Sequence, residues 1–267
     1  MTLKFSKYEG LGNDFIVVDA ELEDAVAAEA AVRLCDRHFG IGADGVLLVL
    51  PAAERSARAR LLIRNADGSR PEMCGNGIRC VALHLARADR AAEARYTIET
   101  DAGALACDVV REGDAAQVSV AMGRARLEPE HAADFAGEER RFMRVSMGNP
   151  HAICFDTHDD VAHIDRFAPE VSRAFPNGSN VEFATTRGRE SFDLVVWERG
   201  VGRTLACGTG AAATAVAAAV SGRAPFDAPI EVRLPGGPLS LSVQRETLAV
   251  SMRGPARLVF VGEVRTP

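Results

Sequence analysis

Two short segments of the sequence place a cysteine directly before a glycine-rich turn and a helix-forming stretch. Residues Cys74–Gly77 read Cys-Gly-Asn-Gly and residues Cys207–Gly210 read Cys-Gly-Thr-Gly, and an apolar stretch containing alanine follows each of them. The N-terminus of a helix exposes backbone N–H groups and carries the positive end of the helix dipole, so it binds anions such as carboxylates. The same field stabilises a thiolate, and we expect it to lower the pKa of both cysteines below the ordinary thiol value of about 8.5.

Two activated thiols in matching settings suit a different task from a single nucleophile. One thiolate can remove a proton from one face of a carbon while the other thiol returns a proton to the opposite face. Because the Cα–H of an amino acid is very weakly acidic, the enzyme must also neutralise the charge that develops on the carboxylate. The pattern predicts an amino-acid racemase or epimerase. Two other classes stay open, namely a cysteine hydrolase that pairs one thiolate with His151 and a non-catalytic module that binds carboxylates.

The four remaining cysteines lack this setting. Cys80 lies six residues beyond Cys74, outside the first helical turn where the dipole acts, and Cys35, Cys107 and Cys154 lie within apolar patterns without adjacent glycines. We predict that all four are structural. No C-x-x-C spacing indicates a zinc site or a small disulfide scaffold.

The numbers and spacing of the lysines and histidines argue against pyridoxal phosphate and against a metal ion. Pyridoxal phosphate is held by a lysine, and the only lysines are Lys4 and Lys7, both in a predicted first strand without a phosphate-binding motif. The six histidines show no H-E-x-x-H or comparable ligand spacing. We therefore expect neither a cofactor nor a metal ion.

Composition places the chain among ordinary globular proteins. Of its 267 residues, 47% are hydrophobic and 25% are charged, which allows one large core or two smaller ones. The formal charge of −6 provides no basic field, so nucleic acid is not an expected partner. The N-terminus lacks the apolar run of a signal peptide, and Ala211–Val220 is too short to span a bilayer. We expect a soluble, cytoplasmic protein that does not bind membranes.

Strand patterns outnumber helix patterns, which predicts an α+β fold. Helices are expected at Ala25–Arg37, Ile78–Ala88 and Ala211–Ser221. An alternating pattern at the N-terminus and nine short segments predict strands; the segments are Phe15–Val18, Val46–Leu50, Leu61–Arg64, Tyr96–Thr100, Gln117–Ala121, Ala152–Phe155, Phe192–Trp197, Ile230–Leu234 and Leu239–Val243.

The sequence also contains a weak internal repeat. The Gly-Asn pair at Asn13 recurs at Asn149, 136 residues later (149 − 13), and the cysteine motif recurs after 133 residues (207 − 74). Two similar offsets in the same order indicate one duplicated unit. Two similar domains would then each contribute one glycine-flanked cysteine to a shared cleft. We expect the first domain over residues 1–118, joined by a C-terminal strand over 257–267, and the second over 119–256.

The chain resembles the diaminopimelate epimerases over nearly its whole length. Five motifs match that family in order, and together they are far more specific than any one alone. They are Gly10–Phe15, Gly40–Gly45, Asn65–Ser69 continuing to Gly77, Met147–His151, and Glu198–Gly200 continuing to Gly210.

The resemblance implies a cofactor-independent isomerase that converts LL-2,6-diaminopimelate into meso-diaminopimelate in lysine and peptidoglycan precursor biosynthesis. It implies two pseudo-symmetric, strand-rich domains that each wrap a central helix, with the active site between them, and it allows a homodimer. The implied acid–base pair is Cys74 and Cys207, supported by His151 and Glu198. The implied substrate-binding residues are Asn13, Asn65, Gly75, Asn76, Asn149, Asn180, Glu198, Arg199, Gly208 and Thr209. A related racemase that acts on another amino acid is the alternative.

Two positions depart from the family pattern. Glu9 stands where the family usually has His, and Arg203 stands where it usually has Glu. Arg203 precedes Cys207 by four residues, so its cation either lowers the thiol pKa or points outward. The sequence alone does not decide between these two arrangements.

Overall fold

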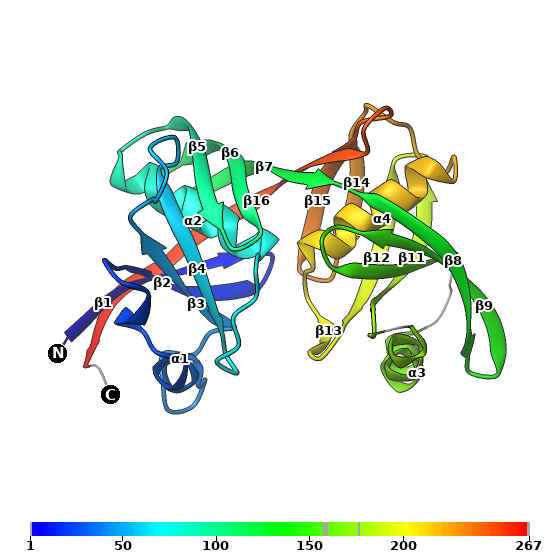
Figure 1. The fold of residues 1–267 in the computed structure, drawn as a ribbon, viewed down its shortest axis with the longest axis horizontal. Helices are drawn as coiled ribbons and strands as arrows, with labels where there is room; N and C mark the ends of the chain where they lie inside the picture. Colours follow the sequence, from blue (N-terminus) through cyan, green and yellow to red (C-terminus); the bar gives the residue numbers. More distant parts are fainter. Residues whose placement is uncertain (1, 157–159, 176, 266–267) are drawn as a thin grey trace. The chain divides into compact units, whose positions relative to one another are not determined.

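The structure is a computed structural model that describes residues 2–156, 160–175 and 177–265. The described chain forms two compact units (Figure 1). Unit 1 holds described residues up to position 120 and from position 254 onward, and unit 2 holds residues 121–253.

The strands of unit 1 form one curved sheet. They are β1 (Thr2–Gly10), β2 (Asn13–Asp19), β3 (Gly45–Leu50), β4 (Ala59–Asn65), β5 (Glu93–Thr100), β6 (Gly103–Glu112), β7 (Ala115–Arg124) and the later part of β16 (Ala249–Arg265). Neighbours in sequence are neighbours in the sheet, and β16 pairs with β1 at one end and adjoins β7 at the other. The sheet of unit 1 therefore closes on itself.

A buried helix occupies the interior of this sheet. Helix α2 (Gly75–Ala88) contacts β1, β2, β3, β5 and β6, and every residue from Gly75 to Leu83 is buried. A helix that is covered on all sides needs small or apolar residues around its whole circumference. A second helix, α1 (Ala28–Cys35), packs on the outer side of β3 and β4 after the short 3-10 turn η1 (Glu23–Ala25).

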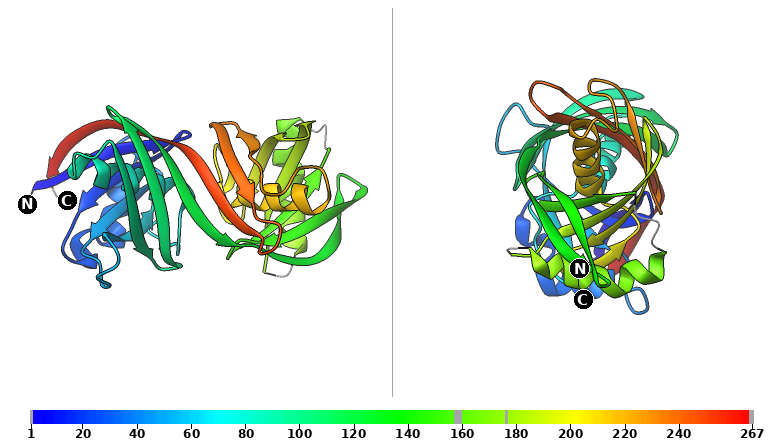
Figure 2. Two further views of the ribbon diagram at one scale, coloured as in Figure 1. Left: turned by 90° about the horizontal axis from the view of Figure 1, so that it is seen from above. Right: turned by 90° about the vertical axis from the view of Figure 1, so that its right-hand side faces the viewer.

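Unit 2 repeats this plan. Its strands are β8 (Arg126–Phe135), β9 (Glu138–Ser146), β10 (Pro150–Phe155), β11 (Asn180–Gly188), β12 (Ser191–Glu198), β13 (Gly202–Thr204), β14 (Ile230–Leu234), β15 (Gly237–Val243) and the start of β16. They surround α4 (Gly208–Val220), as the end-on view of Figure 2 shows. The alanines of α4 are buried and small, which leaves room for the strands to pack closely. Helix α3 (Val161–Ala174) covers an aromatic core that includes Phe135, Phe142 and Phe183.

The order and direction of the elements match between the units. In unit 1 the parallel pairs β2–β3 and β4–β5 are connected through α1 and α2, and in unit 2 the parallel pairs β10–β11 and β12–β14 are connected through α3 and α4. A parallel pair needs a crossover connection, which the helices provide. The α+β, strand-rich fold with a central helix in each half is confirmed.

Several predicted elements need correction. The helix predicted at Ala25–Arg37 is shorter, because the Asp36 carboxylate accepts hydrogen bonds from the N–H groups of His38 and Phe39 and forms a turn that ends α1. The two central helices start three residues earlier than predicted, since the glycines after each cysteine form the first helical turn. The fourth helix, α3, was not predicted at all.

Strands β6, β8, β9, β11 and β13 were also missed, and the C-terminal strand starts at Ala249 rather than 257. The last two positions of that predicted strand, 266–267, lie outside the described residues. Within the described part of the chain, no helix is both long and apolar enough to cross a membrane.

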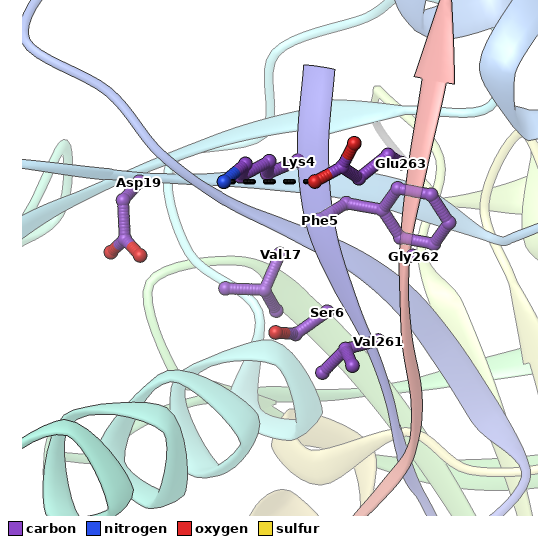
Figure 3. A pocket seen from close by; sticks show the side chains of 8 residues that line it. All are labelled: Lys4, Phe5, Ser6, Val17, Asp19, Val261, Gly262 and Glu263. Atoms are coloured by element: carbon purple, nitrogen blue, oxygen red, sulfur yellow. Dashed lines mark ion pairs between the residues drawn. The ribbon is translucent and has the colours of Figure 1, made fainter. Parts of the chain in front are cut away.

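A pocket lies at the outer edge of unit 1 (Figure 3), where side chains of β1, β2 and β16 meet. Its polar lining includes Lys4, Asp19 and Glu263, and Lys4 forms an exposed ion pair with Glu263. None of the residues predicted to take part in catalysis or substrate binding lines this pocket.

Candidate active site

Cys74 and Cys207 occupy the same position in their respective units, the N-cap of the central helix. Both have extended backbone conformations, with φ and ψ of −138° and 114° for Cys74 and −126° and 107° for Cys207. Each sulfur accepts a hydrogen bond of 3.4 Å from the backbone N–H three residues later, at Gly77 and Gly210. Each sulfur thus lies where the exposed N–H groups and the helix dipole favour negative charge.

The glycine at the third helical position is constrained to a different degree at the two sites. A Cβ on Gly210 would lie 2.9 Å from Oε1 of Glu182 and 3.3 Å from Sγ of Cys207. A Cβ on Gly77 would lie 3.2 Å from a methyl group of Leu47, which is a flexible side-chain end. The first turn of α4 is therefore the more tightly constrained of the two.

Asn13 connects Cys74 to the β1–β2 turn. That turn is tight, with positive φ angles at Leu11 (57°) and Gly12 (80°), which is typical of a two-residue hairpin. The Asn13 amide donates to Asp44 (Nδ2 to Oδ2, 2.5 Å), so its Oδ1 faces the first turn of α2. There Oδ1 accepts from Nδ2 of Asn76 at 3.1 Å and lies 4.0 Å from Sγ of Cys74.

Asp44 is itself held by charge, and it was not among the predicted site residues. Its carboxylate accepts from the backbone N–H of Asp14 and pairs with Arg37, which also pairs with Asp14. The buried ammonium of Lys7 contacts Asp14 and the carbonyl of Gly42. Lys7 is thus engaged in a structural ion pair beneath the turn that carries Asn13.

Asn65 lies at the end of β4, opposite Gly45, and forms a local turn with Ser69. Its Nδ2 donates to Ser69 Oγ at 2.9 Å, and the Gly68 N–H donates to its carbonyl. Gly75 and Asn76, also predicted to bind substrate, are buried in the first turn of α2. The structure thus brings Asn13, Asn76 and Cys74 together, while Asn65 is held in its own turn.

In unit 2 a chain of hydrogen bonds leads away from Cys207. Its Sγ lies 3.6 Å from Oγ1 of Thr209, which accepts from Nδ2 of Asn149 at 3.3 Å. Oδ1 of Asn149 lies 3.0 Å from Nε2 of His151. The opposite ring nitrogen of His151, Nδ1, lies 2.6 Å from Oε1 of Glu182.

Glu182 was missed by the sequence analysis. It is fully buried on β11, where its second oxygen accepts from the Ala152 N–H at 3.2 Å. Burial raises its pKa above the ordinary carboxyl value, and the nearby His151 opposes part of that effect. The local pattern gives no signal for it, because a carboxylate that alternates with Val181 and Phe183 is typical of the solvent side of a strand, whereas both sides of this part of β11 are buried.

The predicted lowering of the Cys207 pKa is wrong for this arrangement. Burial raises the pKa of the Cys207 thiol well above its ordinary value, and the carboxylates of Glu198 and Glu182 raise it further. The hydroxyl of Thr209 and the N–H of Gly210 act in the opposite direction. Desolvation outweighs the helix terminus here, because the thiol is only 5% exposed.

Gly208 is buried as the first residue of α4. The other three predicted residues are connected through β11 and β12. Asn180 is buried at the start of β11, where its Oδ1 accepts from the backbone N–H of Arg199 and its Nδ2 donates to the Pro150 carbonyl. The exposed Arg199 donates from Nη1 to the carbonyl of Asn177. Glu198 accepts from the Thr204 hydroxyl at 2.6 Å. Glu198 and Arg199 thus have separate partners and do not form the simple surface pair that adjacent charges suggest.

The two residues that depart from the family pattern, Glu9 and Arg203, each form an ion pair. Glu9 accepts from the Gly12 N–H at 3.2 Å and pairs with Arg257. Arg203 lies on β13 and pairs with Asp165 of α3 (Nε to Oδ1, 2.9 Å). Arg203 therefore points toward α3, which answers the question that the sequence left open.

The other four cysteines are buried. Burial raises the pKa of Cys35 to about 11 and that of Cys107 to about 12, and it raises the pKa of Cys80 as well. Thiols of this kind carry little thiolate at neutral pH and are poor nucleophiles or bases. Within the described residues, no group of three or more His, Cys, Asp or Glu side chains is arranged to hold a metal ion.

Comparison with known proteins identifies the family. A family model described as diaminopimelate epimerase matches residues 5–128 and 143–259. Diaminopimelate epimerase of Desulforudis audaxviator (strain MP104C) is 44% identical over 279 residues, covering 98% of this chain and 99% of the relative. The enzyme of the same name from Synechococcus elongatus is 43% identical over 283 residues, covering 99% of each chain.

Solved structures support the fold at much lower sequence identity. A probable proline racemase from Agrobacterium radiobacter K84, solved with bound carbonate, is 16% identical with a TM-score of 0.78, covering 99% of this chain and 93% of that one. The two relatives and the family model span nearly the whole sequence, including both cysteine motifs. The chain is a member of the diaminopimelate epimerase family.

Proposed function

We propose that this protein interconverts LL- and meso-2,6-diaminopimelate without a cofactor, using Cys74 and Cys207 as its acid–base pair. The observation that carries the proposal is the matching N-cap position and hydrogen bond of the two cysteines, in two similar units of a diaminopimelate epimerase family member. The family's place in lysine biosynthesis agrees with this reaction.

In the proposed reaction, each of the two cysteines acts on one face of the substrate carbon. A thiolate at one cysteine takes the Cα proton, so a C–H bond breaks and an S–H bond forms on one face. The thiol at the other cysteine then protonates the opposite face, so its S–H bond breaks and a C–H bond of inverted configuration forms. The enzyme ends with thiol and thiolate exchanged, and the reverse reaction uses the same two groups in swapped roles.

The helix N-termini supply the second requirement, which is stabilisation of the carboxylate as it gains enolate-like charge. Backbone N–H groups at Gly75–Asn76 of α2 and at Gly208–Thr209 of α4 are the proposed donors. Such fixed donors need no reorganisation as the charge develops, which makes them effective in a site that excludes water.

The remaining predicted residues are proposed to bind the distal amino-acid end of diaminopimelate. Arg199 suits a carboxylate because its guanidinium has five N–H donors, of which the bond to Asn177 engages only Nη1. Asn180 holds the Arg199 backbone, and Glu198 is suited to an ammonium group. Asn65 and Asn149 complete the proposed set.

A hydrolase mechanism fits the geometry less well. It requires a histidine in direct contact with the nucleophilic sulfur. His151 instead contacts Asn149 and Glu182 and connects to Cys207 only through Asn149 and Thr209. The arrangement therefore supports acid–base chemistry in preference to acyl transfer.

The experiment is an epimerisation assay with purified, reduced protein and LL-diaminopimelate, without added cofactor. We expect meso-diaminopimelate to form with the wild type, and Cys74→Ser and Cys207→Ser each to lose most of the turnover. Cys80→Ala is the matched control, because Cys80 lies in the helix that Cys74 caps but is buried away from the N-cap. Wild-type rates in either serine variant would contradict the proposal, and turnover of a different amino acid alone would favour the related-racemase alternative.

Two finer predictions accompany the function. The biosynthetic role of the family supports a cytoplasmic location, which cell fractionation would test. The family resemblance allows a homodimer, and sedimentation at several protein concentrations would show whether it forms.

A further inference from the structure

The hydrogen-bond chain of unit 2 has a direction, which can be read from the groups that only donate or only accept. Oδ1 of Asn149 is an acceptor, so Nε2 of His151 must carry its proton. The same assignment turns Nδ2 of Asn149 toward Thr209, whose oxygen accepts that bond. With its oxygen engaged in this way, the Thr209 hydroxyl can direct its own hydrogen at Sγ of Cys207.

The far end of the chain is a fully buried pair that shares one proton. Since Nε2 of His151 is protonated, the contact between Nδ1 and Glu182 holds either an imidazolium beside a carboxylate or a neutral imidazole beside a carboxyl group. The pair has no net charge in both forms, which is what full burial of both side chains requires. Both forms keep a proton on Nε2. Glu182 therefore holds His151 in a form that donates from Nε2 to Asn149, which the hydrogen-bond chain requires.

The electrostatic setting of Cys207 shows why a directed donor matters. The carboxylates of Glu198 and Glu182 face its sulfur and disfavour a thiolate, whereas the donors at Gly210 and Thr209 favour it. Because the buried Glu182–His151 pair carries no net charge, replacing the carboxyl group of Glu182 by an uncharged side chain beside a neutral His151 leaves the net charge near the sulfur unchanged. The Gly210 N–H belongs to the helix backbone, and it is present whatever the side chains do. The Thr209 hydroxyl can rotate about its C–O bond, so the direction of its hydrogen depends on which donor its oxygen accepts a hydrogen bond from.

We propose that Glu182 is a positioning residue that acts through His151, Asn149 and Thr209 to aim the Thr209 hydroxyl at the Cys207 thiolate. The inference rests on the proposed role of Cys207 as an acid–base group. It assigns a catalytic use to the most deeply buried acidic side chain near the site, and it makes Thr209 a side-chain donor in addition to a backbone one. Because a hydroxyl both donates and accepts, Thr209 can also serve the thiol form when the roles of the two cysteines swap.

The test measures the ionisation of Cys207 directly and does not depend on turnover. In a Cys74→Ser background, the rate at which iodoacetamide alkylates Cys207 is followed against pH by peptide mass spectrometry. Thr209→Val removes the hydroxyl, and Glu182→Met removes the carboxyl group at nearly constant length. We expect each variant to cut the thiolate fraction at neutral pH about tenfold, the typical worth of one hydrogen bond to a charged group.

Two further variants separate positioning from simple structural support. Glu182→Gln keeps both contacts, since its amide donates to Nδ1 of His151 and its oxygen accepts from Ala152, so the wild-type profile should be retained. Glu182→Asp withdraws the carboxylate by one methylene and should give an intermediate loss even if the Met variant folds poorly. Circular dichroism checks the fold of every variant.

A double-mutant cycle decides whether Glu182 acts through Thr209. We expect Glu182→Met to have little further effect on Cys207 alkylation in the Thr209→Val protein. An equal loss in both backgrounds, or a wild-type profile in the folded Met variant, would overturn the inference. A protein that alkylates as expected yet fails to epimerise diaminopimelate would refute the proposed function and leave the positioning result intact.

Discussion

Replacing Gly210 by alanine tests how tightly the first turn of α4 is packed against the buried Glu182–His151 pair. In an unconstrained helix this change stabilises by about 0.5–1 kcal/mol, because alanine restricts the unfolded chain and suits the helix. Here the added Cβ would lie 2.9 Å from Oε1 of Glu182, closer than ordinary contacts allow. That oxygen cannot retreat easily, since it contacts His151 at 2.6 Å while its partner oxygen binds Ala152.

The size of the destabilisation follows from the hydrogen bond that the added Cβ disturbs. Displacing the carboxylate weakens one buried, charge-assisted hydrogen bond, which is worth about 1.5–3 kcal/mol. Subtracting the helix gain leaves a net destabilisation of about 1–2 kcal/mol for Gly210→Ala. The distorted chain to Cys207 should also lower the rate of epimerisation by at least about tenfold.

Gly77→Ala is the matched control at the equivalent position of α2. Its Cβ would meet a flexible methyl group of Leu47 at 3.2 Å, so we expect stability within about 1 kcal/mol of the wild type. Urea unfolding followed by fluorescence measures both free energies, and the epimerisation assay measures both rates. Equal behaviour of the two alanine variants, or a fully stable and active Gly210→Ala protein, would refute the packing argument.

Three other predictions address the surroundings of the two cysteines. Asp44→Ala should lower the epimerisation rate about tenfold, because the Asn13 amide loses the acceptor that orients it, and a rate unchanged from wild type would count against that role. Arg203→Ala should change the rate less than about twofold, since its ion pair with Asp165 is half exposed and worth about 1 kcal/mol or less. The free energy of unfolding should fall as pH rises above about 8.5, because a buried thiol such as Cys107 keeps a proton that the unfolded chain releases. Between pH 8 and pH 10, urea unfolding should show a slope that Cys107→Ala reduces by about 1 kcal/mol per pH unit, and an identical slope in the variant would contradict the sign of the shift.

Much of the fold could be predicted because its signals are local. The strands β3 and β14 were placed within one residue of their observed bounds, since their apolar runs end at clear turn residues. The strands β8 and β9 were missed because they are polar and exposed along much of their length. Their pairing depends on tertiary contacts with α3 and α4, which a local pattern does not record.

Helix α3 shows how the internal repeat could have predicted more than it did. It occupies the place of α1 in the duplicated plan, between two parallel strands, and the repeat offset points to its position. A proline inside a helix is locally unfavourable, yet α3 continues through Pro169. The Asp160 carboxylate accepts an N-cap hydrogen bond from the His163 N–H, and this bond together with the buried face of Ile164, Ala168 and Val171 outweighs that local penalty.

The candidate site was predicted unevenly for a physical reason. Residue types and glycine spacing identify Cys74, Cys207 and the asparagines, because those features are visible along the chain. Glu182 and Asp44 act through contacts made across neighbouring strands, so their importance appears only once the strands are paired. The Cys207 pKa was predicted in the wrong direction since helix dipoles can be read from sequence, whereas desolvation depends on burial.

The most direct test of the two-base account is the fate of hydrogen during the first turnovers of LL-diaminopimelate in D2O. If one cysteine removes the proton and the other supplies a new one from solvent, early meso product should carry deuterium at the inverted carbon while recovered substrate remains unlabelled. Early product that retains the hydrogen of the substrate would mean that a single group removes and returns the proton, and would contradict the assignment of Cys74 and Cys207 as an acid–base pair.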